Sequence, residues 1–233
     1  MRTAQPRELF AEPRPSEVCV YVMTPLSSQP PRLSLPQFRA ALLRLHGDLF
    51  TIELYIKKSL VYSSDSLTMV EKLTLVLEDR RFFNHQGIDL VSCIREIFRA
   101  ITFRRHGGAS TIDMQLVRTA TGYRERTFRR KLYEMLLAWL LQFRYSKIVI
   151  LRSYLACAFF GSHLIGAESA ARKLFNRPAN DLSLDEAAVV AALLVYPRPR
   201  TPTASWMSRV ERRAKYGKRI YVSNKKRFDQ LPG

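Results

Sequence analysis

The sequence predicts an all-α protein with a single domain of ordinary size. Apolar residues make up 47% of the 233 residues, which is enough to build one hydrophobic core. From residue 64 onward, apolar side chains recur at helical spacing, and helix-start signals precede several of these runs. We therefore expect an atypical N-terminal arm over residues 1–63, a helical domain over residues 64–205 and a basic C-terminal tail over residues 206–233.

The N-terminal arm has two parts. Residues 1–36 hold seven of the twelve prolines, which predicts an irregular or extended segment with a candidate short strand over residues 18–23. Residues 37–60 carry an imperfect apolar face at helical spacing. Residues 1–23 lack the basic-then-apolar pattern of a signal peptide, and the chain has no run of about 18 uncharged apolar residues. We therefore expect neither a signal peptide nor a transmembrane helix in this chain.

The first helix of the domain places a carboxylate at its end. Thr68 and Glu71 form a capping-box pattern, and the helix is expected to run to about Asp79. Glu78 then follows an apolar run, Leu73 and Leu75 to Leu77. An apolar wall and the negative end of a helix both raise the pKa of a carboxyl group, which suits a general base. The alternative is an ordinary helix end, with Glu78 and Asp79 paired to the two arginines that follow.

The next helices are predicted over residues 88–103 and from Ser110 and Thr111 onward, with a basic loop over residues 104–108 between them. Ser110 and Thr111 either cap their helix in the ordinary way or offer hydroxyl and N–H groups to a phosphate. Gly87, before the first of these helices, is expected to adopt a backbone angle that other residues resist.

The helix that Thr127 caps has the strongest pattern, and we expect it to be largely buried. Its apolar face consists of Phe128, Leu132, Leu136, Trp139, Leu140 and Phe143, and Leu137 and Leu141 extend it around the helix. Glu134 lies in this helix, four residues after Arg130 and three after Lys131. It is either a partner in a surface ion pair or a second carboxylate that lines a cleft. Further helices are expected over residues 148–160, 167–175 and 187–195.

The formal net charge of +18 implies an anionic partner, which is nucleic acid, a phosphate-bearing substrate or an anionic membrane surface. No helix-turn-helix or similar module is recognisable, so nucleic acid is not expected. The basic segment over residues 209–227 is either a solvated tail or a surface that docks on anionic lipid. Cys19, Cys93 and Cys157 are odd in number and lack metal-ligand spacing, which predicts free thiols, with Cys93 and Cys157 buried.

An ordered set of motifs gives a sharper indication of function. The segments are EDRRFFNHQG at residues 78–87, GGASTIDMQL at 107–116, RTFRRKLYE at 126–134, SKIVILRSYLACAFFG at 146–161 and AARKLF at 170–175. In this order and spacing they resemble the motifs of the peptidoglycan glycosyltransferases. These are the monofunctional transglycosylases and the N-terminal domains of bifunctional penicillin-binding proteins. The resemblance covers roughly residues 66–202.

The resemblance implies a lysozyme-like helical fold with two lobes and a long cleft between them. It implies polymerisation of lipid II, an undecaprenyl-pyrophosphate-linked disaccharide, with the growing glycan chain as donor and inversion at the donor carbon. It also implies work at the periplasmic face of the bacterial inner membrane, as a peripheral protein in this chain's case, with other cell-wall synthesis proteins as candidate partners. The alternative is a catalytically weak or inactive relative that binds glycans or partner proteins.

The motif matches also imply roles for individual residues. Glu78 is the expected catalytic base, and Glu134 is the second catalytic carboxylate and a candidate ligand for Mg²⁺ or Mn²⁺; no organic cofactor is expected. The expected substrate-binding residues are Asp79, Arg81, His85, Ser110, Thr111, Gln115, Arg118, Arg126, Arg130 and Lys131. His85 is expected to shape its loop rather than to act directly.

Several positions depart from the family pattern. Asp113 and Met114 replace a small polar residue and a glutamine, Ala156 replaces an asparagine, and Asn176 with Arg177 replaces Gly-Lys. Asp113 is expected to face the donor and to repel its pyrophosphate, although a position in solvent or at the cap of the first helical turn is the alternative. These departures put donor handling, and with it activity, in question.

Overall fold

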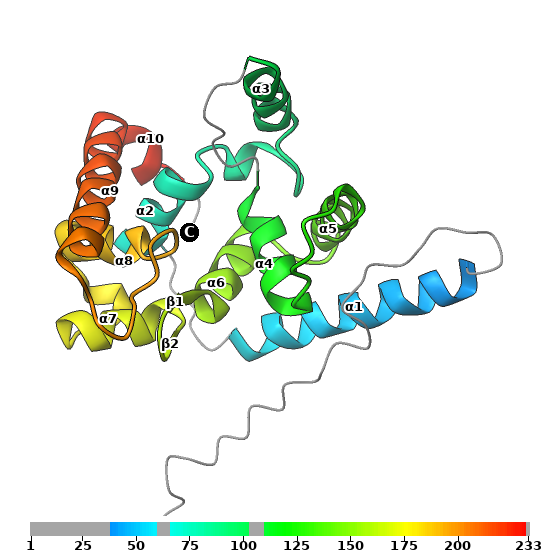
Figure 1. Cartoon of the computed structure of the whole chain (residues 1–233), viewed down its shortest axis with the longest axis horizontal. Coiled ribbons are helices and arrows are strands. Elements are labelled where there is room, and N and C mark those ends of the chain that lie inside the picture. Colours follow the sequence, from blue (N-terminus) through cyan, green and yellow to red (C-terminus); the bar gives the residue numbers. More distant parts are fainter. Residues whose placement is uncertain (1–37, 60–65, 103–109, 232–233) are drawn as a thin grey trace, which may run out of the picture.

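The computed structural model describes residues 38–59, 66–102 and 110–231, and it confirms the all-α prediction (Figure 1). The proline-rich arm with its candidate strand, Cys19 and the basic loop lie outside the described residues. The longer elements are α1 (Phe38–Ser59), α2 (Met69–Glu78), α3 (Leu90–Ile101), α4 (Ile112–Thr121), α5 (Phe128–Leu141), α6 (Lys147–Cys157), α7 (Ala167–Phe175), α8 (Leu184–Ala192) and α9 (Ala204–Ser223). The shorter ones are two 3₁₀ turns (Phe82–Asn84 and Ala179–Asp181), α10 (Lys225–Asp229) and the antiparallel strands β1 (Phe159–Gly161) and β2 (Leu164–Ile165).

The helices form two groups that meet at α2, α4 and α6. One group contains α2, α7, α8, α9 and α10, and the other contains α1, α4, α5 and α6 (Figure 1). Helix α6 contacts α2 and α7 of the first group and packs along α4 and α1 of the second. The C-terminal end of α2 therefore lies at the junction of the two groups.

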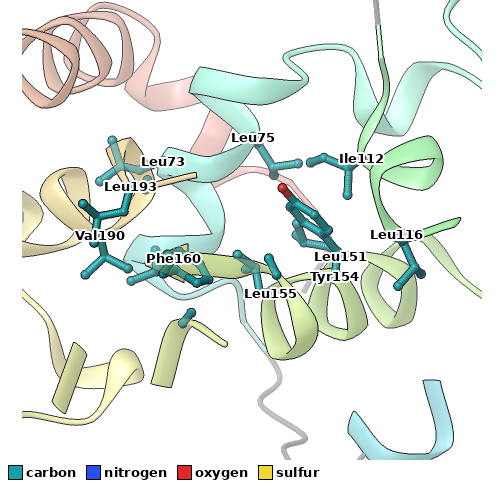
Figure 2. Close-up of a cluster of buried hydrophobic side chains, with 14 of the residues drawn as sticks. Leu73, Leu75, Ile112, Leu116, Leu151, Tyr154, Leu155, Phe160, Val190 and Leu193 are labelled. Atoms are coloured by element: carbon teal, nitrogen blue, oxygen red, sulfur yellow. The ribbon is translucent and has the colours of Figure 1, made fainter. Parts of the chain in front are cut away.

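A continuous apolar core joins the two groups. Figure 2 shows Leu73 and Leu75 of α2 near α6, α4 and α8, whose labelled side chains are Leu151, Tyr154, Leu155, Ile112, Leu116, Val190 and Leu193. All of these are at most 6% exposed. The expected capping box of Thr68 and Glu71 is present and begins α2, and Ser183 with Glu186 begins α8 in the same way. Local caps and shared burial together fix where α2 ends.

The prediction that the apolar face of α5 is buried is wrong. Its large members are 41–75% exposed: Phe128, Leu132, Leu136, Trp139 and Phe143. The opposite side packs inward instead, through Tyr133, Glu134 and Ala138 together with Leu137 and Leu141, the two members of the expected apolar set that are buried. This orientation is possible because Tyr133 donates a hydrogen bond to Asp48 and Glu134 is ion-paired, so neither polar group is buried without a partner.

Two other expectations concern exposure. On α3, Ile94 and Phe98 of the expected apolar face are 54% and 65% exposed, so this helix also presents apolar side chains outward. Cys93 and Cys157 are free, as expected, and are partly rather than fully buried.

The basic C-terminal segment is folded. Helix α9 packs against α8 and α2 and buries Trp206, Val210, Ala214 and Tyr221, while its other face carries the basic side chains. Gly217 allows a close approach to α2, because a Cβ at this position would lie 3.0 Å from Leu77. Residues beyond the recognised motifs therefore contact the end of α2.

Gly87 has the backbone angle that its place in the sequence predicts. Its φ is +78°, in the left-handed region that favours glycine. In addition, a Cβ at this position would lie 2.5 Å from the carbonyl oxygen of Ala138 in α5. Gly87 therefore lets the loop after α2 lie directly against α5.

We predict that Gly87→Ala destabilises the fold by more than Gly122→Ala. Gly122 also has a positive φ, +69°, but open space surrounds it, so its replacement costs only the left-handed strain of about 1–2 kcal/mol. Gly87→Ala adds a backbone clash of roughly 1–3 kcal/mol. Urea unfolding measures both free energies, and equal losses in the two variants would contradict the close contact.

Candidate active site

Glu78 is the last residue of α2, and two side chains from other helices hold its carboxylate. Arg213 of α9 donates from Nη2 to Oε1 of Glu78 at 2.8 Å, and Gln115 of α4 donates from Nε2 to Oε2 at 3.4 Å. The Glu78 side chain is 12% exposed. The alternative pairing of Glu78 with Arg80 and Arg81 is not formed: Arg80 donates to the Val76 carbonyl, and Arg81 pairs with Asp89.

The orientation of the Gln115 amide is set from the other side by Tyr154 of α6. The Tyr154 hydroxyl donates to Oε1 of Gln115 at 2.6 Å. Burial raises the pKa of Tyr154, so the hydroxyl keeps its proton and acts as a donor. The amide oxygen is thereby committed to Tyr154, and the NH₂ group turns towards Glu78.

Glu134 of α5 is the centre of a second cluster. It meets α4 at Arg118, about one helical turn after Gln115. The Glu134 side chain is fully buried, and Arg118 donates to both of its oxygens at 2.9 and 3.1 Å. Arg130 also pairs with Oε1 of Glu134. Lys131 donates to the Ser110 hydroxyl at 2.7 Å, and Arg118 reaches the same hydroxyl at 3.4 Å. Three cations therefore surround one carboxylate, and the cluster keeps a net positive charge.

The cationic groups of this cluster differ in how firmly they hold their protons. Hydrogen bonding to Glu134 raises the pKa of Arg118, which stays charged. Burial lowers the pKa of Lys131. The Lys131 ammonium therefore loses its proton at a lower pH than an ordinary lysine, and its attraction for an anion weakens correspondingly early as the pH rises.

A cavity of about 300 Å³ reaches from Glu78 to Ser110 and Thr111. Its walls come from the end of α2, from α3 and from Tyr216 of α9. Four arginines line it: Arg80, Arg81, Arg95 and Arg99. Four carboxylates line it as well, those of Glu78, Asp79, Asp89 and Glu96. The carboxylate of Glu78 and the hydroxyl that the cation cluster binds therefore face one space whose walls carry charges of both signs.

Asp79, His85, Asp113 and Lys147 form an internal network beside this cavity. Asp79 accepts hydrogen bonds from Nε2 of His85 at 3.0 Å and from the Ile112 N–H at 3.3 Å. The Lys147 ammonium lies 3.1 and 3.2 Å from the two oxygens of Asp113 and 3.5 Å from Nδ1 of His85. It also lies over the Phe82 ring, 4.3 Å from the centroid. The network ties the loop after α2 to the start of α4 and the start of α6.

The comparisons with known proteins identify the family of the chain. The family model described as "Transglycosylase" matches residues 49–220, which is more than half of the chain. The chain belongs to the transglycosylase family. A penicillin-binding protein 1A of Rickettsia bellii is 35% identical over 153 residues, covering 64% of this chain and 19% of the relative. A penicillin-binding protein 2a of Streptococcus pneumoniae is 35% identical over 157 residues, covering 67% of this chain and 21% of the relative.

The chain thus spans about a fifth of the length of these relatives. The family assigns it a glycosyltransferase domain of the lysozyme-like, all-α type. The motif residues that the resemblance implied lie mainly around the junction of the two helix groups: Glu78, Ser110, Gln115, Arg118, Arg130, Lys131 and Glu134.

Three further motif residues have other surroundings. Arg126 is exposed in the loop before α5 and forms no hydrogen bond or ion pair with another described residue. The Thr111 hydroxyl donates to the Gly87 carbonyl at 2.7 Å and caps α4 by accepting from the Met114 N–H. His85 shapes its loop through Asp79, as expected.

The expectation that Asp113 faces the donor is wrong. Asp113 is fully buried and binds Lys147 and Gln142, so it points away from the cavity. Burial raises the pKa of Asp113 and lowers that of Lys147, and the contact between the two opposite charges acts against both changes. Met114 is a buried core residue. Neither departure therefore adds a negative charge to the transglycosylase cleft.

The departure at Asn176 also has a local explanation. Asn176 ends α7 with a φ of +53°, in the left-handed conformation that glycine or asparagine commonly supplies at a helix C-terminus. Arg177 pairs with Asp181 and Glu186. Ala156 lies near the end of α6, and its carbonyl faces Gly166.

The surroundings of Glu134 do not fit a divalent metal. Mg²⁺ needs several oxygen ligands, whereas both oxygens of Glu134 are committed to guanidinium groups. Among the described residues, Asp79, His85 and Asp113 bring potential ligand atoms within 4.8 Å of one another, but the Lys147 ammonium already supplies the cation there.

Arg213, Tyr154 and Lys147 were not among the expected site residues. Tyr154 and Lys147 stand inside quoted motifs, but a motif does not tell which neighbour a side chain meets. Arg213 lies outside the motifs recognised in the sequence. Its one local signal is its place next to Ala214 and four residues before Gly217, on the small-residue side of α9 that can approach another helix closely.

We predict that Asp113→Asn destabilises the domain by about 3–5 kcal/mol, because it leaves the buried Lys147 charge without its counter-ion. The variant that combines Asp113→Asn with Lys147→Met removes both charges and should lose less stability than Asp113→Asn alone. Urea unfolding measures the free energies. If the double variant loses as much stability as Asp113→Asn and Lys147→Met lose in sum, the two side chains do not act as a pair.

Proposed function

We propose that this domain polymerises lipid II into glycan strands, with Glu78 as the general base. The observation that carries the proposal is the arrangement along α4. Gln115 binds Glu78, and three residues later Arg118 binds Glu134 within the cation cluster. Residues three apart lie on one side of a helix, so the candidate base and the cation cluster lie side by side along α4. The cavity is lined by Glu78 itself and by Ser110, whose hydroxyl the cluster binds.

In the proposed reaction the 4-hydroxyl of lipid II attacks the anomeric carbon of the growing chain, and the configuration at that carbon inverts. Glu78 takes the hydroxyl proton as the new C–O bond forms. The pyrophosphate leaves with the electrons of the broken bond, and Arg118, Arg130 and Lys131 offset its charge. General-base assistance of this kind contributes roughly 10²–10⁴-fold to the rate.

The state of Glu134 argues against hydrolysis by a pair of carboxyl groups. In such enzymes a second free carboxyl group assists at the scissile bond, and water is the acceptor. Glu134 is buried and bound by two arginines, so it organises cations rather than exchanging a proton. One carboxylate that accepts a proton, with cations beside it, is suited to a donor with a pyrophosphate leaving group, because that group needs charge compensation rather than a proton from a second carboxyl group.

We also propose that the domain acts as a peripheral protein at the periplasmic face of the inner membrane, where it would meet lipid-linked substrates. The exposed apolar residues of α3 and the net charge of +18 support an anionic bilayer as partner. Within the parts of the chain that the structure describes, no helix is both long enough and apolar enough to cross a bilayer.

Glu78→Gln keeps the shape of the side chain and removes its basicity. We expect glycan polymerisation from labelled lipid II, resolved on a gel, to fall by at least two orders of magnitude. Glu211→Gln, at an exposed position of α9, is the matched control and should polymerise normally. Wild-type turnover by Glu78→Gln, with the fold intact by circular dichroism, would remove Glu78 from the mechanism.

Binding to vesicles tests the membrane proposal. Co-sedimentation with phosphatidylglycerol vesicles should weaken from low to high salt, because each Lys or Arg near the surface contributes about 1 kcal/mol that salt screens. Phe98→Asp on α3 should reduce binding further, whereas Met207→Asp at an exposed position of α9 should not. Equal binding to neutral vesicles, or no binding to either kind, rejects the proposal.

A further inference from the structure

We infer that Arg213 is a positioning residue for Glu78, holding one carboxylate oxygen so that the other receives the proton. The inference rests on the proposed function, because it assigns a role to a residue that touches the base rather than the substrate. It brings α9, from the end of the chain, into the catalytic apparatus.

The contacts of Arg213 fix the carboxylate relative to the helix that carries it. Its Nη2 atom donates to Oε1 of Glu78 at 2.8 Å and to the carbonyl oxygen of Leu77 at 3.2 Å. One nitrogen thus bridges the backbone and the side chain of adjacent residues at the C-terminal end of α2. A charge-assisted bond of this length restricts rotation of the Glu78 side chain.

The two oxygens of Glu78 are consequently not equivalent. Oε1 accepts the short bond from Arg213, whereas Oε2 accepts, from the residues that the structure describes, only the long, 3.4 Å bond from Gln115. A proton acceptor needs an available lone pair, and Oε2 has it. Because Tyr154 fixes the Gln115 amide, the structure identifies Oε2 as the atom that takes the proton of the acceptor hydroxyl.

Helix α9 is held firmly enough to act as this support. Trp206 and Tyr221, near its two ends, are buried. Gly217 lets it pack closely against Leu77, the residue before Glu78. Arg213 also has a buried polar atom without a partner among the described residues, which is unfavourable and is not expected of an ion pair that only stabilises the fold. Its Nε–H is buried and has no hydrogen-bond partner. The orientation of the guanidinium therefore favours the hydrogen bonds to Glu78 and to the end of α2 over hydrogen bonds for all of its own N–H groups.

The test compares Arg213→Ala, Arg213→Lys and Arg212→Ala, the last at the exposed neighbouring position, by steady-state polymerisation of lipid II. We expect Arg213→Ala to lower kcat roughly tenfold to a hundredfold, as for a misplaced catalytic group, with little change in KM. Arg213→Lys keeps a donor and should recover part of kcat. Arg212→Ala should behave as wild type.

The outcomes separate the two ideas. No polymerisation by the wild type would sink the proposed function. An active wild type with unchanged kcat in Arg213→Ala, or with a change confined to KM, would overturn the positioning role alone. If Arg213→Ala unfolds by circular dichroism, Arg213→Lys decides: a folded lysine variant with a reduced kcat and an unchanged KM supports the role, and a folded lysine variant with wild-type kcat overturns it. A double-mutant cycle of Arg213→Lys with Glu78→Gln in urea gives a second readout, and the absence of coupling would contradict the pair.

Discussion

Helix α4 must direct polar side chains to three different places while most of its surface is buried. Asp113 points into the protein to Lys147, Gln115 meets Glu78, and Arg118 reaches Glu134. The apolar residues between them pack into the core (Figure 2). A change in the rotation of α4 would break all three contacts together, so the two carboxylate centres are set by one helix.

The sequence was sufficient for the helical class and for most helix starts, because caps and apolar spacing are local. Thr68 and Thr127 begin their helices as predicted. It was also sufficient for Gly87, where a turn needs a positive φ. The ordered motifs named Glu78 and the residues of the cation cluster together, because motifs in one order and spacing are typical of one shared fold.

The remainder depended on which faces meet in space. A helical wheel cannot say whether the larger apolar face or the face with Glu134 points inward, and for α5 the ion pairs with Arg118 and Arg130 make the second choice possible. The same holds for Asp113, whose charge predicts repulsion only if Lys147 is ignored. Arg213 is separated from Glu78 by most of the domain, so only the packing of α9 on α2 reveals the contact.

The outward apolar stripe on α5 has a consequence for how copies of the domain behave in solution. Phe128, Trp139 and Phe143 form part of a surface that attracts another apolar surface. The net charge of +18 acts against this attraction, because like-charged copies repel one another over roughly 10 Å at 0.1 M salt. Colloidal stability of the domain is therefore a balance between a short-range apolar force and a longer-range charge, and ionic strength sets which one prevails.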